Sequence, residues 1–104
     1  MFNAVVVRVG SHKKHPPVSV GYGQALATGN VTPSGTAQTV VTAPNRPHDE
    51  DIAVILFAEE PVWVEVGPSA TAAAGTSFAM GVTGGIDRME LAIAPGHSVS
   101  VITR

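Results

Sequence analysis

The stretch "DIAVILFAEE" (residues 51–60) decides the fold that we expect for this chain. Successive side chains of a β-strand point to opposite faces of a sheet, and a strand here carries apolar side chains on both faces. They are Ile52, Val54 and Leu56 on one face and Ala53, Ile55 and Phe57 on the other. A sheet with one face in water alternates apolar and polar residues instead. This segment is therefore either central and covered on both faces, or its outer face meets another subunit.

A short helix is the competing interpretation, because periodicity alone does not separate a short apolar run in a helix from one in a strand. The β-branched residues and the flanking Pro61 favour a strand. The next segment, residues 62–66, alternates clearly: three valines form a core face, and Trp63 and Glu65 lie opposite. An outward Trp beside an outward Glu indicates partial cover by a neighbouring loop or chain.

Further extended segments are expected on both sides, at residues 2–9, 18–29, 36–44, 77–80 and 88–103. Along residues 37–42, alternation is predicted to set Ala37, Thr39 and Val41 on one face and Gln38, Val40 and Thr42 on the other. The last segment is predicted to be a hairpin. Its turn, Ala94 to His97, has Pro and Gly at the positions that a type II turn prefers. About eight short strands separated by Gly and Pro predict an all-β fold, a single-domain antiparallel β-sandwich over residues 1–104, jelly-roll-like, with a small barrel as the alternative.

Residues 68–77 are almost all Pro, Ser, Ala, Thr or Gly. Small side chains suit places where backbones approach closely, against the same chain or another one. Together with the doubly apolar segment, they favour assembly through sheet faces or edges, since an unpaired edge otherwise invites uncontrolled association.

The composition points in the same direction. Only 13% of the residues are charged, against about 25% in a typical soluble domain, and this deficit favours a surface that other subunits hide. A net charge of −2 with six basic residues argues against nucleic-acid binding, which needs clustered Lys and Arg. The chain has no cysteine, which excludes disulfides. We find no signal-peptide pattern and no apolar run long enough to span a bilayer, and we expect a chain made in a cytoplasm with no membrane partner.

No residue pattern specifies a catalytic or metal site, and we expect no cofactor. The four histidines, His12, His15, His48 and His97, lack the spacing of zinc motifs, although a symmetry axis could gather copies of one of them. The acidic run at residues 49–51 lacks the calcium-loop pattern, and no serine lies in a G-x-S-x-G context. The basic run "HKKH" is either a solvent-facing loop or a docking loop.

The second half of the chain, Pro61 to Thr103, carries a recurring pattern: a V-x-V strand, a small-residue loop and a final P-G turn with alternating Val and Ile. The matching residues are Val62, Val64, Gly67, Ala70, Thr71 and Ala72, then Ile93, Pro95, Gly96, Val99, Val101 and Ile102. In this pattern the chain resembles the C-terminal half of small β-sandwich virion proteins of tailed phages and prophages. Some of these are thought to decorate or cement capsids, and others lie at the neck, tail or fibre.

The resemblance implies a non-enzymatic virion structural protein, a capsid cement or decoration subunit that binds where capsomers meet on the particle surface. Its partners would be itself, as a homodimer or homotrimer, and the major capsid protein. We expect the oligomer interface at Ile55, Phe57 and Trp63. The residues expected to dock on the capsid lie in two loops: His12, Lys13, Lys14, His15, Arg46, His48 and Asp49. The alternative is a receptor- or glycan-binding tail, fibre or neck component that uses Trp63 or Tyr22, and a hydrolase is a distant third.

Overall fold

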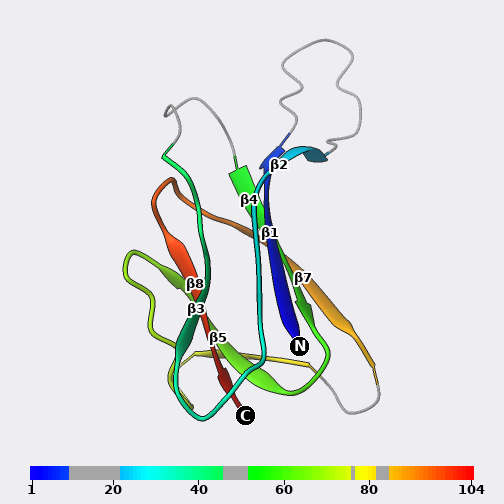
Figure 1. Ribbon diagram of the computed structural model, residues 1–104, viewed down its shortest axis with the longest axis vertical. Coiled ribbons are helices and arrows are strands. Elements are labelled where there is room, and N and C mark those ends of the chain that lie inside the picture. The colour runs from blue at the N-terminus through cyan, green and yellow to red at the C-terminus, as the bar shows by residue number, and fades with distance from the viewer. Residues whose placement is uncertain (10–21, 46–51, 76, 82–84) are drawn as a thin grey trace.

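The computed structural model of the 104-residue chain describes residues 1–9, 22–45, 52–75, 77–81 and 85–104. These residues form two four-stranded antiparallel sheets and no helix (Figure 1). Sheet A has the order β2 (Tyr22–Val31), β1 (Phe2–Val9), β4 (Ile52–Ala58) and β7 (Asp87–Ala92). Sheet B has the order β3 (Gln38–Thr42), β8 (Ser98–Thr103), β5 (Val62–Gly67) and β6 (Phe78–Met80). The sheets pack together, which confirms the predicted all-β sandwich.

The order of the strands is jelly-roll-like, because the chain passes repeatedly from one sheet to the other instead of completing one sheet first. Only β1–β2 and β5–β6 join neighbours within a sheet. The predicted hairpin at residues 88–103 is therefore wrong. β7 pairs with β4 in sheet A, and β8 lies between β3 and β5 in sheet B.

The predicted turn of that segment is nevertheless present. Gly96 has φ 80°, and the His97 amide donates to the Ala94 carbonyl over 3.1 Å, as in a type II turn. The turn is also bonded to the end of β3: the Gly96 amide donates to the Ala43 carbonyl, and the Ala43 amide donates to the His97 carbonyl. These bonds direct the following strand to β3 in sheet B.

The core lies between the sheets. The largest fully buried side chains are Phe2, Leu56, Met80, Val6, Val54, Val62, Val64, Val99 and Val101. Full burial of a side chain of this kind contributes about 1.5–3 kcal/mol relative to exposure. The doubly apolar segment becomes β4, which lies in the interior of sheet A between β1 and β7, and six of its seven residues are buried. This confirms its prediction as a strand.

The backbones of the two sheets come close together where β2 passes near β3. Gly29 pairs with the small residue Ala4 on β1, and a Cβ atom at Gly29 would collide with the carbonyl oxygen of Val40. The alternation predicted along residues 37–42, which sets Val40 and Val41 on opposite faces, breaks at these residues, because both valines belong to the core cluster. A register shift between Thr39 and Val41 against β8 makes this possible.

Candidate functional site

The outer face of sheet A carries an apolar cluster. Val7, Ala53 and Ile55 are 5%, 8% and 9% exposed, and partly buried Val5, Val9 and Phe57 pack around them. We call these six residues of β1 and β4 the outer cluster. It is separate from the core, because β1 and β4 direct their alternate side chains away from sheet B. Sheet A thus has apolar side chains on both faces along its two central strands.

β7 borders the outer cluster with charged residues. The Arg88 guanidinium lies 5.9 Å from the centre of the Phe57 ring, within the range of a cation–π contact, and it forms an ion pair with Glu90. Phe57 pairs with Arg88 across the two strands, and Ile55 pairs with Glu90. The two charges are therefore fixed at the edge of an apolar face.

Part of the outer face of sheet B, at β8, is covered by the chain itself. Residues 70–75, which we call the strap, lie along β8. The Ala72 amide donates to Ser100 Oγ over 3.0 Å, and the Ala70 amide donates to Ser98 Oγ over 3.3 Å. Ala72 is 3% exposed and Ser100 1%. Small residues let the backbone of the strap come within hydrogen-bond distance of the sheet.

The strap and its following turn also hold Glu65. The Ala73 amide donates to Ser77 Oγ, and Ser77 Oγ donates to Glu65 Oε1 over 3.1 Å. Glu65 lies on the outer face of β5, where we predicted partial cover by a loop or chain. Near Glu65, the cover is a segment of the same chain.

Trp63 lies on the outer face of sheet B, between Ala79 of β6 and Ile102 of β8. The Arg104 guanidinium is 5.9 Å from its ring centre and also donates to the Gly81 carbonyl over 2.5 Å. The three residues predicted for the oligomer interface are therefore divided. Ile55 and Phe57 share the outer face of sheet A, and Trp63 lies on the opposite side of the sandwich.

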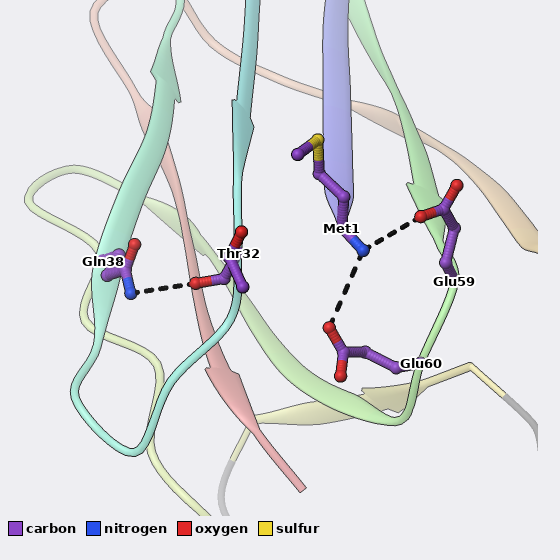
Figure 2. A network of polar contacts seen from close by, with 5 residues as sticks. All are labelled: Met1, Thr32, Gln38, Glu59 and Glu60. Carbon is purple, nitrogen blue, oxygen red and sulfur yellow. Dashed lines mark hydrogen bonds and ion pairs between the residues drawn. The ribbon is translucent and has the colours of Figure 1, made fainter.

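Both chain ends meet the turn between β4 and β5 (Figure 1). The Met1 α-amine forms ion pairs with Glu59 over 2.9 Å and with Glu60 over 3.7 Å (Figure 2). At the other end, the Arg104 amide donates to the Pro61 carbonyl. The hydrogen bond to Glu59 raises the pKa of the α-amine above its ordinary value of 8.0, and the negative charges of the two carboxylates act in the same direction.

A second polar group in Figure 2 closes the loop between β2 and β3. Gln38 Nε2 donates to the Thr32 carbonyl over 3.2 Å and to Ser34 Oγ over 2.9 Å. These contacts are exposed and local. They order the loop and bring together no reactive groups.

The residues predicted to dock on a capsid all lie outside the described residues: His12, Lys13, Lys14, His15, Arg46, His48 and Asp49. Within the described part of the chain, no three His, Asp or Glu residues gather where they could hold a metal ion. The described part of the chain also contains no helix that is long and apolar enough to cross a membrane.

The chain matches no family model, no curated protein and no solved structure. Sequence reasoning missed two features that the fold brings together: the strap on the β8 serines and the charged pair on β7. The first had a visible signal, the S-V-S alternation of residues 98–100, which places two serines on the face opposite the core valines. The charged pair on β7 had no such signal in the sequence. The chain crosses from sheet B to sheet A before β7, and this crossing determines that β7 pairs with β4.

Proposed function

We propose that this chain is a non-enzymatic structural protein of a tailed-phage virion, a capsid cement or decoration subunit that acts as a homo-oligomer. The observation that carries the proposal is the outer cluster on sheet A. A β-sandwich without partners needs apolar side chains only on the inner face of each sheet. The strands β1 and β4 carry apolar side chains on both the inner and the outer face of sheet A. Val7, Ala53 and Ile55 are already buried in the single chain, so another protein would contact this face through the partly buried Val5, Val9 and Phe57 around them.

Two further observations support the proposal. The low charge content fits a molecule with much of its surface in contact with other subunits. The sequence pattern of residues 61–103 resembles small virion proteins, and its residues fall on structural elements: the valines on β5, the small residues in the strap, and the P-G turn before β8. On a symmetric shell, many weak contacts add up to firm attachment, so a small subunit can reinforce a capsid without catalysis.

The test is made on the particles whose genome encodes the chain. We expect mass spectrometry of purified particles to find the chain, and electron cryomicroscopy to place a small two-sheet density where capsomers meet. Particles from a genome that lacks the coding sequence should release their DNA at a lower temperature, and purified chain should restore the original temperature. Particles that contain no copy of the chain would overturn the proposal.

The same images distinguish the alternative predicted from the sequence. Density at the tail tip or fibre, with glycan binding that Trp63→Ala abolishes, would assign the chain to adhesion instead. Trp63 is partly buried beside Arg104, and the variant Ala79→Ser, at an exposed residue paired with Trp63, serves as the control for a nonspecific change of that face.

A further inference from the structure

The strap, residues 70–75, is attached to sheet B through side-chain hydroxyls. The Ala70 amide donates to Ser98 Oγ over 3.3 Å, and the Ala72 amide donates to Ser100 Oγ over 3.0 Å. Neighbouring strands of a sheet are joined by a ladder of backbone hydrogen bonds instead. β8 has its own backbone partners, β3 on one side and β5 on the other. Loss of the strap therefore leaves the pairing of sheet B complete.

The strap also buries little apolar surface. Ala72 is the one residue of the strap that is buried, and residues 71 and 73–75 are exposed. The stabilisation from apolar burial grows with the area removed from water, and one methyl group removes much less area than a core valine. Segments with few buried apolar contacts and an exposed backbone open locally, without unfolding of the whole protein.

Both ends of the strap have an unusual backbone conformation. Ser69, directly before the strap, has φ 54°, and Gly75, its last residue, has φ 81°. Glycine adopts a positive φ readily, whereas a residue with a Cβ atom is strained there. The attached strap thus holds Ser69 in a strained conformation, which detachment of the strap would release. Rotation at these two residues would move the segment between them as a unit.

We infer that the strap opens as a unit about Ser69 and Gly75, while the two sheets stay folded. Opening breaks the amide bonds of Ala70 and Ala72 to the serines of β8. It leaves no polar group buried without a partner, because the freed amides and hydroxyls then face water, and burial without a hydrogen bond is what makes a polar group costly.

The open strap uncovers a polar row on the outer face of sheet B. Ser100 is 1% exposed under the strap, and it pairs with Glu65 of β5 and Thr39 of β3. Residues directly opposite each other on paired strands share a face, so these three side chains form one row. The strap therefore controls access to the row, and a partner that binds the row would shift the equilibrium toward the open state. This device does not depend on a role in virions.

Hydrogen exchange of the unmodified chain tests the inference, followed by NMR at several urea concentrations below the unfolding transition. The amides of Ala70 and Ala72 should exchange roughly tenfold or more slowly than in an unstructured peptide, and roughly tenfold or more quickly than the slowest amides of β5 and β8. Their rates should hardly change with urea, because opening exposes little surface. The rates of the slowest amides should rise with urea, because global unfolding exposes much more.

Two results would overturn the inference. If Ala70 and Ala72 exchange with the rate and the urea dependence of the slowest amides, the strap opens only when the whole domain unfolds. If they exchange as fast as in an unstructured peptide, the strap has no closed state to open from.

The variant Ser98→Ala/Ser100→Ala removes the two acceptors and should speed exchange at Ala70 and Ala72 by roughly tenfold or more. Ser34→Ala, which removes a hydroxyl from the exposed loop between β2 and β3, is the control and should leave these rates unchanged. Unchanged rates in the double variant would contradict the inference, and the unmodified chain decides the matter if that variant does not fold. All these measurements use the isolated chain, so their failure leaves the virion proposal standing, and particles without the chain leave the strap opening intact.

Discussion

Gly29 lies beneath the carbonyl group of Val40, where β2 of sheet A passes close to β3 of sheet B. A methyl group there would collide with backbone, which cannot rotate away as a side chain can. We predict that Gly29→Ala lowers the free energy of unfolding by about 1–3 kcal/mol or more, as overpacking of a close contact does. Urea denaturation measures the difference.

Gly35 provides the matched control. It lies in the loop between β2 and β3, and nothing lies within 4 Å of a Cβ atom built on it. Gly35→Ala should leave the free energy of unfolding unchanged or raise it by about 0.4–1 kcal/mol, because alanine restricts the unfolded chain. Equal effects at the two glycines would show that chain entropy, and not the contact with Val40, determines the result.

The strap is the element that the small residues make possible. Ala72 is buried against sheet B, and its amide donates to Ser100 Oγ, while Ala74 is exposed on the same segment. We predict that Ala72→Leu lowers the free energy of unfolding by about 1–3 kcal/mol by lifting the strap from the sheet. Ala74→Leu should change it by less than about 0.5 kcal/mol. Thermal or urea unfolding of both variants checks this, and a stable Ala72→Leu would contradict the close approach that we describe.

The elements themselves could largely be predicted from the sequence, because their signals are local. Alternation gave the faces of residues 62–66, and the apolar side chains on both faces of residues 52–57 indicated a strand covered on both faces, either inside the sheet or by another subunit. The hairpin at residues 88–103 could not be judged from local signals. Its type II turn is present in the structure. The strands that β7 and β8 pair with, however, depend on the sheet that each strand joins and on the hydrogen bonds between the turn and Ala43.

The association surface was harder to predict, because it depends on the whole molecule. Sequence reasoning grouped Ile55, Phe57 and Trp63 as outward apolar residues, and the fold places Trp63 on the other side of the sandwich. Alternation tells which residues share a face of one strand, but it does not tell which strands share a sheet.

The contact between the Met1 α-amine and the turn after β4 gives the stability of the molecule a dependence on pH. The pKa of the Met1 α-amine is raised by Glu59 and Glu60, so the folded state favours the protonated amine. The resulting stabilisation is fully present below the ordinary pKa of 8.0 and is lost as the pH rises through the raised pKa of the folded state. The groups are about half exposed, and the effect should be small and weaken with salt.

Melting temperatures between pH 7 and pH 10 at low salt measure this loss. The variant Glu59→Gln/Glu60→Gln should lose stability at pH 7 and show a flatter profile than the unmodified chain over the alkaline range. An unchanged profile would mean that the α-amine contacts contribute nothing to the folded state.

The central claim is that this small sandwich covers the partly buried residues of its outer cluster, Val5, Val9 and Phe57, by association. Sedimentation equilibrium of the unmodified, purified chain over a wide range of concentrations tests it most directly. We predict a mass of at least twice the 10.6 kDa of one chain at tens of micromolar, falling toward one chain on dilution. A single species of 10.6 kDa at every concentration would contradict the account.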